Sequence, residues 1–211
     1  MKSNRADVGG EAPAAGGTPV ERLGQRALRT RQRILDTSKQ LFLERGYAGT
    51  SVNSITTACG ISRAGLYTYF RDKREIFEIL GTRTHREILT VVESLENLPQ
   101  PASRTDFEVW VREYFDFMNE HGPFILAAQS APPDEEIRIA GNRLQMRVAW
   151  LIGLHLRNRQ KTPTQTPEAL GLTIHAMLDR SWFHLRGQGV PVDEDDIITT
   201  ISENLVAVLA G

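Results

Sequence analysis

The spacing of apolar residues predicts a short helix between residues 50 and 59. Val52, Ile55, Thr56 and Cys59 recur at intervals of three and four residues, as on one face of a helix. The hydroxyl residues Thr50 and Ser51 precede this face and are of the kind that cap a helix N-terminus. Gly60 follows it, and glycine adopts the left-handed turn that ends a helix.

A second helix is predicted directly after this turn. Ser62 stands at its capping position, and Leu66 and Phe70 lie on one side of it, joined by Ile61 from the turn. The opposite side carries small side chains at its N-terminal end, then aromatic and hydroxyl side chains, and one cation. Its residues are Arg63, Ala64, Gly65, Tyr67, Thr68 and Tyr69. Two helices joined by a glycine turn, the second with a flat polar face, are typical of a helix-turn-helix, whose second helix enters the DNA major groove.

Two further helices flank this pair. Apolar residues from 30 to 45 predict a helix that Gly46 ends, and a long helix from 73 to 98 opens at the capping pattern Asp72 and Glu75. We expect residues 26–75 to form a three-helix domain. A domain of this size buries little apolar surface, so it should pack against residues 76–211.

The rest of the chain also reads as helical, and prolines interrupt the pattern. We expect a short helix to begin at Pro123 and a long one to be capped by Asp134. The predicted helices are 104–120, 124–129, 134–160, 167–187 and 193–210. No strand pattern is present, so the sequence predicts an all-α protein of about nine helices, with a helix-turn-helix domain followed by a helical bundle.

Charge is distributed unevenly along the 211 residues, although the net charge is only -1. Residues 21–75 contain 11 Lys and Arg against 5 Asp and Glu, whereas residues 76–211 contain 12 against 19. A basic N-terminal segment on an acidic remainder indicates a module that binds a polyanion. An uneven solvated surface would give the same counts, so charge alone is a weak signal.

The remaining composition indicates a cytoplasmic protein. No apolar run approaches the length of a membrane span, the N-terminus has no apolar core of a signal peptide, and the single Cys59 excludes an intrachain disulfide. Residues 1–25 are rich in Gly, Ala and Pro, so we expect a disordered arm. Arginines cluster at its end, and Arg29 is a candidate DNA contact, although a solvated tail is an equal alternative.

Catalytic chemistry finds no support in the sequence. There is no phosphate-binding glycine loop and no paired cysteine, and we expect none of the five histidines to pair with an acid one helical turn away. The acidic run at 193–196 suits the start of a helix better than a metal site. We therefore expect no enzyme, no cofactor and no metal.

Residues 30–77 resemble the DNA-binding domain of the TetR family of transcriptional regulators. The pattern that carries the resemblance is F at 42, R-G-Y at 45–47, T-S-V at 50–52, I at 55, G-I-S-R-A-G-L-Y at 60–67, Y-F at 69–70, K at 73 and I-F at 76–77. Thr56 and Cys59 depart from it, because the family usually has alanine there. Both residues are small, and we expect Cys59 to be packed and inert.

The resemblance implies roles in binding double-stranded operator DNA. It places Thr50, Ser51 and Lys73 near phosphates. Arg63 is the best candidate for reading a base, since a guanidinium can bridge O6 and N7 of guanine. The remaining candidates lie on the second helix and its flanks: Ser62, Ala64, Gly65, Tyr67, Thr68 and Tyr69. For Tyr69, packing against the first helix is about as good an interpretation.

The resemblance also implies a homodimer and an effector site in the bundle. The apolar stripes of 167–187 and 193–210 supply the candidate dimer contacts Leu170, Ile174, Met177, Leu178, Ser181, Ile201, Leu205 and Val208, although the same stripes could complete the monomer core. A small hydrophobic effector is favoured by the candidate lining residues Trp110, Tyr114, Phe117, Met118, Phe124, Asn142, Met146, Trp150, His155 and His175. Each of the aromatic residues could instead be core.

The sequence-level hypothesis is a dimeric repressor that a hydrophobic ligand releases from its operator. Effector binding beside the helix at 73–98 would tilt that helix and change the separation of the two recognition helices. Two alternatives stay open. One is an all-α small-molecule binding protein or enzyme without operator specificity, and the other is an adaptor that uses its last two helices to bind a protein partner.

Overall fold

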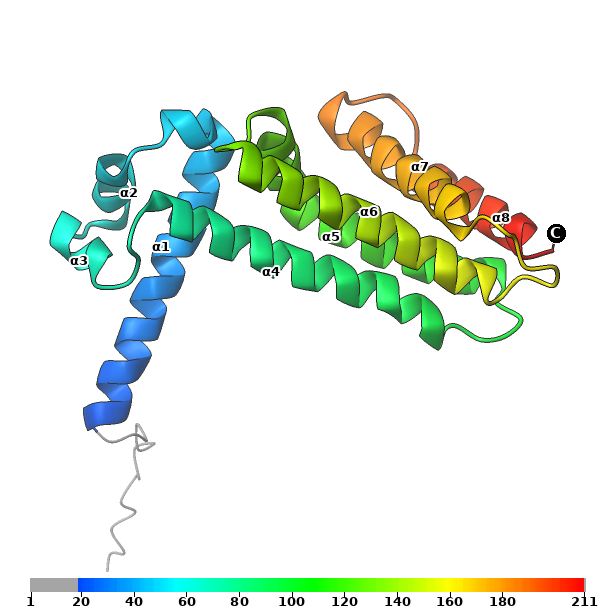
Figure 1. Cartoon of the computed structure of the whole chain (residues 1–211), viewed down its shortest axis with the longest axis horizontal. Coiled ribbons are helices and arrows are strands. Elements are labelled where there is room, and N and C mark those ends of the chain that lie inside the picture. The colour runs from blue at the N-terminus through cyan, green and yellow to red at the C-terminus, as the bar shows by residue number, and fades with distance from the viewer. Residues whose placement is uncertain (1–18, 211) are drawn as a thin grey trace, which may run out of the picture.

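The computed structural model describes residues 19–210, which form eight α-helices and one short 3₁₀ helix and contain no strand. The elements are α1 (Pro19–Gly49), α2 (Val52–Cys59), α3 (Arg63–Tyr67), α4 (Lys73–Glu93), η1 (Ser94–Asn97), α5 (Arg104–Ser130), α6 (Glu135–Arg157), α7 (Pro167–Gly187) and α8 (Glu194–Ala210). The all-α prediction is confirmed. In Figure 1, α1, α2 and α3 lie at one end of the molecule, and α4 leads from them into the bundle.

The first helix begins earlier than the sequence predicts. α1 starts at Pro19, so residues 19–25 are helical, and only residues 1–18 of the expected disordered arm lie outside the described residues. Gly46 has φ 69° and ψ 170°, which breaks the helical conformation where the sequence predicts its end. Arg29 is exposed on α1.

The N-terminal core combines α1, α2 and α3 with the first turns of α4. Ile34, Phe42, Ile55 and Leu66 are fully buried in it, and Cys59 is buried as a free thiol. Ile76, Phe77 and Leu80 of α4 belong to the same cluster, as does Phe124 of α5, whose ring centroid lies 5.1 Å from that of Phe77. The small domain therefore packs on the body, as its size requires.

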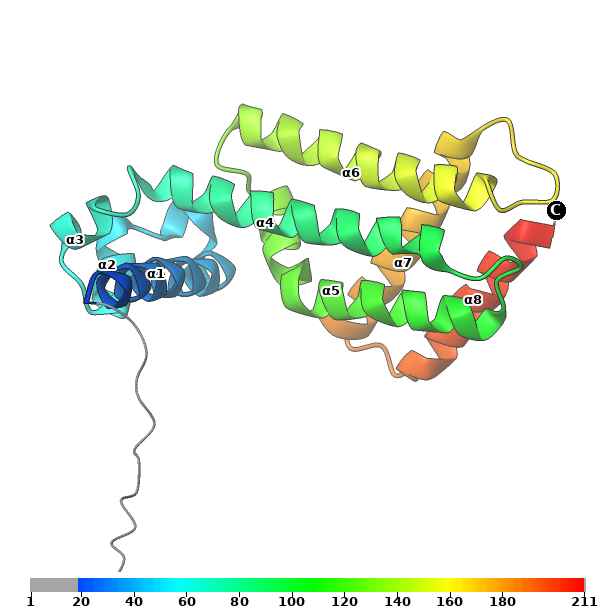
Figure 2. The same ribbon diagram turned by 90° about the horizontal axis from the view of Figure 1, so that it is seen from below.

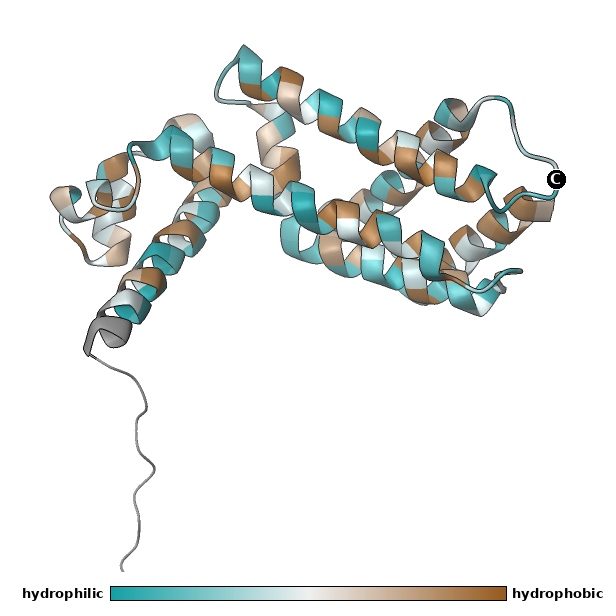
Figure 3. Cartoon of the chain, turned by 60° about the horizontal axis from the view of Figure 1, so that its bottom comes forward, coloured by the Kyte–Doolittle hydropathy of each residue, from teal (hydrophilic) through white to brown (hydrophobic). Residues whose placement is uncertain are grey.

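The body is a bundle in which α4 lies beside both α5 and α6, and α7 and α8 cover the far side (Figures 1 and 2). Hydrophilic and hydrophobic segments alternate along each of these helices, as expected for amphipathic helices (Figure 3). The second core contains Trp110, Phe115, Ile152, Leu178 and Leu205, from four different helices.

The predicted break at Pro123 is wrong. α5 is continuous from Arg104 to Ser130, and Pro123 lies inside it at an exposed position. Proline removes one backbone hydrogen bond at a cost of roughly 3 kcal/mol. The buried residues on either side, Met118 and Phe124, offset this cost by keeping both halves of the helix packed on the cores.

Candidate nucleic-acid interface and cavity

Two side-chain caps fix the helix-turn-helix geometry. Ser51 Oγ accepts from Ser54 N at 3.0 Å, and Ser54 Oγ accepts from Ser51 N at 3.0 Å, which closes a capping box at the start of α2. Gly60 adopts φ 63° and ψ 37°, so the chain turns left-handedly after α2. Ser62 Oγ then accepts from Gly65 N at 3.0 Å and caps α3.

The predicted polar face of α3 is open to solvent. Ser62, Arg63, Ala64, Tyr67 and Thr68 are exposed. Gly65 and Tyr69 are half-buried. Tyr69 packs against the N-terminal core, which agrees with the packing role that was the alternative to a DNA contact. Leu66 and Phe70 are buried beneath the face, so a well-packed core holds the exposed side chains in place.

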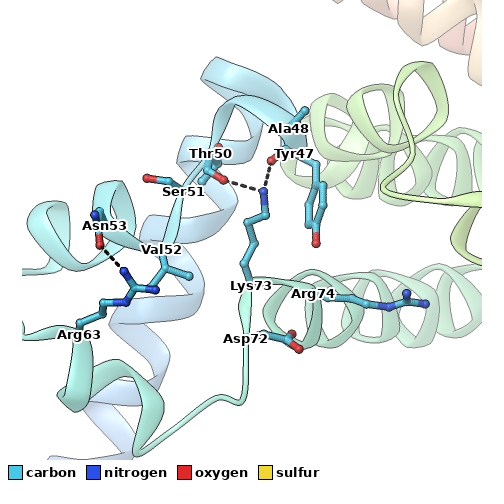
Figure 4. A pocket seen from close by; sticks show the side chains of 10 residues that line it. All are labelled: Tyr47, Ala48, Thr50, Ser51, Val52, Asn53, Arg63, Asp72, Lys73 and Arg74. Atoms are coloured by element: carbon cyan, nitrogen blue, oxygen red, sulfur yellow. Dashed lines mark hydrogen bonds between the residues drawn. The ribbon is translucent and has the colours of Figure 1, made fainter.

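Arg63 is held loosely and points outward from α3. Its Nη1 donates to Asn53 Oδ1 at 3.4 Å, and its Nη2 donates to the Tyr67 hydroxyl at 3.3 Å. Figure 4 shows Arg63 and Asn53 together at the edge of an open depression beside the helix-turn-helix. Both hydrogen bonds are long, so a stronger acceptor can replace them. Asn53, an exposed residue of α2, was not among the sequence candidates.

Thr50 does not fit its predicted phosphate contact. Its side chain is in the interior at 1% exposure, and its hydroxyl lies 3.0 Å from Leu41 O and 2.9 Å from Gly46 O. It thus stabilises the end of α1 from within. Ser51, beside it, is exposed at the start of α2 and keeps the position that a phosphate contact needs.

Lys73 also differs from its prediction. Its ammonium donates to Tyr47 O and Thr50 O, both at 2.7 Å, and lies 4.1 Å from the centroid of the Tyr47 ring (Figure 4). Burial lowers the pKa of Lys73. Through two strong hydrogen bonds and a cation–π contact, this lysine links the start of α4 to the end of α1 and the turn after it.

A second hollow, a cavity of about 530 Å³, lies within the body. Its walls come from α4, α5, α6 and α7. Six of the predicted ligand residues line it: Tyr114, Phe117, Met118, Phe124, Asn142 and His175. This size is within the range of small-molecule sites.

Four predicted ligand residues do not line the cavity. Trp110 is a core residue whose Nε1 donates to Val91 O at 2.8 Å. His155 is buried elsewhere, with Nδ1 3.1 Å from Glu96 Oε1. Met146 and Trp150 are exposed on α6, at 55% and 43%. The residues of α6 that line the cavity include Ile137, Leu144 and Val148, with the exposed Gly141 at its border.

The cavity contains polar residues that the sequence interpretation missed. Tyr114 donates to Asp179 Oδ1 at 2.5 Å, and His175 Nε2 lies 3.5 Å from Asp179 Oδ2. His175 and Asp179 are one helical turn apart on α7, so the expectation that no histidine pairs with an acid at this spacing is wrong. That spacing was the signal in the sequence that could have identified Asp179.

Burial and neighbouring charges shift the pKa values of two groups that line the cavity, Tyr114 and His85. Complete burial, followed by the charge of Asp179 and the hydrogen bond to it, raises the pKa of Tyr114 well above its ordinary value. Burial, helped by the charge of Arg147, lowers the pKa of His85. The Nε2 atom of His85 is buried and has no hydrogen-bond partner among the described residues.

Half of the predicted dimer contacts on α7 and α8 face inward. Ile174, Leu178, Ile201 and Leu205 are buried in the core of their own chain, which corrects their assignment to an interface. The amphipathic stripe that marks them in the sequence is the side that completes the monomer. The other four candidates are half-buried at the borders of this stripe: Leu170, Met177, Ser181 and Val208.

One group of possible metal ligands occurs among the described residues. Glu87, Glu120 and His121 lie together where α4 and α5 meet α1. Both carboxylates are exposed, and Lys39 Nζ lies 3.4 Å from His121 Nδ1 and 4.0 Å from Glu120 Oε1. Lys39 supplies the positive charge that a metal ion would otherwise bring to these three side chains. The cluster is therefore an ion-pair network across the domain junction.

The N-terminal geometry agrees with the comparisons to known proteins. Residues 34–80 match the family described as bacterial regulatory proteins, tetR family. The regulator AcrR of Shigella flexneri is 42% identical over 53 residues, 25% of each chain, and the repressor BepR of Brucella suis is 36% identical over 63 residues, 29% of this chain and 30% of that protein. The chain spans less than half of the length of the curated relatives it matches.

Similarity in three dimensions extends over more of the chain. A transcriptional regulator from Aquifex aeolicus superposes with a TM-score of 0.66 over 85% of this chain and 99% of its own, at 22% identity, which supports the fold alone. The N-terminal unit is a helix-turn-helix domain. This domain is similar to the DNA-binding domains of bacterial regulatory proteins of the tetR family, which confirms the resemblance of residues 30–77. No helix within residues 19–210 is long and apolar enough to cross a membrane.

Proposed function

We propose that this chain is a sequence-specific DNA-binding transcriptional regulator that places α3 in the major groove. The exposed face of α3, set on buried Leu66 and Phe70, is the observation that carries this proposal. Ser62, Ala64 and Gly65 at the start of α3 are small, so the backbone there can approach the bases closely. As a DNA-binding regulator, the protein would act in the cytoplasm.

The proposed contacts divide into base readout and positioning. Arg63 reads a base edge, and Tyr67 contacts a phosphate or a thymine methyl group. Positioning contacts come from exposed or half-buried residues around them: Arg29, Ser51, Ser62, Ala64, Gly65, Thr68 and Tyr69. Thr50 and Lys73 act from within, by holding the start of α2 and of α4 in place.

We propose a homodimer, because the five-residue α3 reads too few base pairs alone. Two copies would meet half-sites about 34–36 Å apart. The half-buried border residues of α7 and α8, such as Met177 and Val208, are the candidates that remain for the shared surface.

We further propose that a small, largely apolar effector binds the body cavity and releases the protein from its operator. α4 supports this role, since it lines the cavity with Phe77, Thr84 and Ile88 and also packs against α1. A ligand that tilts α4 would change the separation of the two recognition helices. By linkage, operator DNA would weaken effector binding by the same factor.

Selection from random double-stranded DNA with the full chain tests the central claim. We expect enrichment of a two-fold symmetric sequence with half-sites one helical turn apart. Weak, steeply salt-sensitive binding without a preferred site would overturn the proposal and favour an all-α ligand-binding protein. Size determination of the pure protein tests the dimer, since a monomer at micromolar concentration would favour the adaptor alternative.

A further inference from the structure

The cavity has one strongly polar region, built around Asp179 of α7. Tyr114 occupies one carboxylate oxygen of Asp179 with a hydrogen bond of 2.5 Å, and His175 approaches the other at 3.5 Å. All three residues line the cavity. The Asp179 side chain keeps 31% exposure, so its carboxylate can be reached from the cavity.

The charges around the cavity are not balanced. Two carboxylates and one guanidinium line it, from Glu78, Asp179 and Arg138. Arg74 binds Glu78 at 2.7 Å, and Glu135 binds Arg138. Among the described residues, no lysine or arginine forms an ion pair with Asp179. The partners of this carboxylate among the described residues are the Tyr114 hydroxyl and the His175 ring.

The other polar groups of the cavity, Arg138 and Glu78 apart, can form hydrogen bonds but bring no positive charge. His85 brings a buried Nε2 without a hydrogen-bond partner, and burial together with Arg147 favours its neutral form. The remaining uncharged polar lining consists of hydroxyls and amides from Thr82, Thr84, Gln129, Asn142 and Gln145. A carboxylate ligand would be repelled by Asp179, and the one guanidinium among the described lining residues, that of Arg138, is already paired with Glu135.

We propose that the effector is a basic amphiphile, whose apolar part lies against Phe117, Met118 and Val148 and whose protonated nitrogen binds Asp179. This inference rests on the proposed function, because it takes the cavity as the effector site. An ammonium supplies the missing positive charge and donates hydrogen bonds to the carboxylate. A cavity of about 530 Å³ has room for a linear chain of about ten carbons.

Three ligands with the same alkyl chain and different head groups test this. Decylamine, 1-decanol and decanoate are titrated separately into the full chain near neutral pH, below their critical micelle concentrations, and binding is followed by calorimetry. We expect decylamine to bind at least tenfold more tightly than decanoate, with 1-decanol between them. Equal or tighter binding of decanoate would overturn the proposal, and so would the absence of binding by all three.

A matched pair of variants locates the effect. Asp179→Asn should reduce decylamine affinity to within about threefold of 1-decanol and leave 1-decanol unchanged. Asp116→Asn removes the same charge at an exposed position of α5 outside the cavity and should keep the full preference. An unchanged preference in Asp179→Asn would overturn the assignment to Asp179.

A second variant keeps the site testable if Asp179→Asn does not fold. Tyr114→Phe releases one oxygen of Asp179, so decylamine should bind as tightly as before or more tightly, and a loss of the amine preference would contradict the proposal. These titrations use no DNA, so they separate the two levels of inference. Site-specific DNA binding without an amine preference would refute the ligand class alone, and an amine preference without a preferred DNA site would refute the regulator.

Discussion

Arg74 joins the first turn of α4 to Asp134, the residue that caps α6. Its Nη1 lies 2.7 Å from Asp134 Oδ2, and the same guanidinium binds Glu78 and Glu136, each at 2.7 Å. Arg74 borders the depression beside the helix-turn-helix (Figure 4), whereas Glu78 lines the cavity in the body. This cluster is thus a direct contact between the proposed effector site and the base of the DNA-binding domain.

Arg74→Ala is expected to weaken the communication between the two sites while preserving both. The ion pairs of Arg74 lie in solvent, so their loss should shift the melting temperature little. Operator affinity without ligand should stay within about threefold of the native protein. The ratio of operator affinities without and with saturating decylamine should fall by about fivefold or more.

The control for Arg74→Ala is Arg104→Ala, which removes an exposed ion pair with Glu108 inside the single helix α5. That variant should keep the native ratio. If Arg74→Ala also keeps it, then coupling passes through the packed contact between Phe77 and Phe124 instead.

Tyr67→Ala is expected to abolish operator binding and leave the fold intact. Tyr67 is 45% exposed, so removal of its ring should change the free energy of unfolding by no more than about 0.5 kcal/mol. Gel-shift titration and thermal unfolding measure the two effects. Tyr67→Phe keeps the ring and separates its contribution from that of the hydroxyl. Unfolding of Tyr67→Ala would show that this ring is part of the core.

Arg63→Ala is expected to relax base preference at one position in each half-site. A bidentate contact to guanine is worth about 1–3 kcal/mol of discrimination, or roughly tenfold to a hundredfold in relative affinity. Binding to a library that varies one half-site position at a time measures this loss. A uniform decrease across all sequences would instead identify Arg63 as a phosphate contact.

The helix-turn-helix could be predicted from the sequence because its signals are local. Ser51, Gly60 and Ser62 each fix the backbone within a few residues, and each adopts the conformation that its residue type favours. The exposed face of α3 follows from these positions and from the spacing of Leu66 and Phe70. Contacts between residues far apart in the chain could not be predicted from such local signals. The carbonyl groups that Lys73 binds, for example, lie 23 and 26 residues away from it.

The body was predictable as helices but not as surfaces. An apolar stripe shows which side of a helix is buried, but not whether the same chain or a second copy covers it. Ile174 and Leu205 were therefore predicted at an interface, whereas both are buried in the core of their own chain. Trp150 has the chemistry of a pocket residue, yet it lies outside the helix face that carries Leu144 and Val148. Asp179 was missed because aromatic residues, not acids, guided the choice of cavity candidates.

Gly153→Ala is expected to destabilise the protein by forcing α6 and α7 apart. A Cβ on Gly153 would lie 1.8 Å from Pro167 O, and one on Gly171 would lie 1.8 Å from Ala149 O. Backbone atoms cannot yield as flexible side chains do, so we expect a loss of about 3 kcal/mol or more in the free energy of unfolding. Denaturant unfolding measures it.

Gly141→Ala is the matched control for Gly153→Ala. It lies in the same helix, is exposed, and has nothing within 4 Å of an added Cβ. Alanine favours a helix over glycine by about 0.5–1 kcal/mol, so this variant should be slightly more stable than the native protein. Equal effects of the two substitutions would contradict a close contact between α6 and α7.

Tyr114→Phe is expected to change how stability depends on alkaline pH. Burial and Asp179 raise the pKa of Tyr114 in the folded state, whereas an unfolded tyrosine ionises near pH 10. Below pH 10 the phenol is neutral in both states, and the hydrogen bond to Asp179 contributes about 1–3 kcal/mol to the native protein. Above pH 10 only the unfolded phenol ionises, so this contribution is lost as pH rises, by up to about 1.4 kcal/mol per pH unit.

The stability curves of the native protein and Tyr114→Phe should therefore converge above pH 10. Urea unfolding at intervals between pH 8 and pH 11 measures the difference between them, and the subtraction cancels the other tyrosines, which are common to both proteins. A difference that stays constant over this range would mean that Tyr114 ionises as readily in the cavity as in water. In that case the Tyr114 hydroxyl would not be shielded from water beside Asp179, and the polar region of the cavity would be open to solvent.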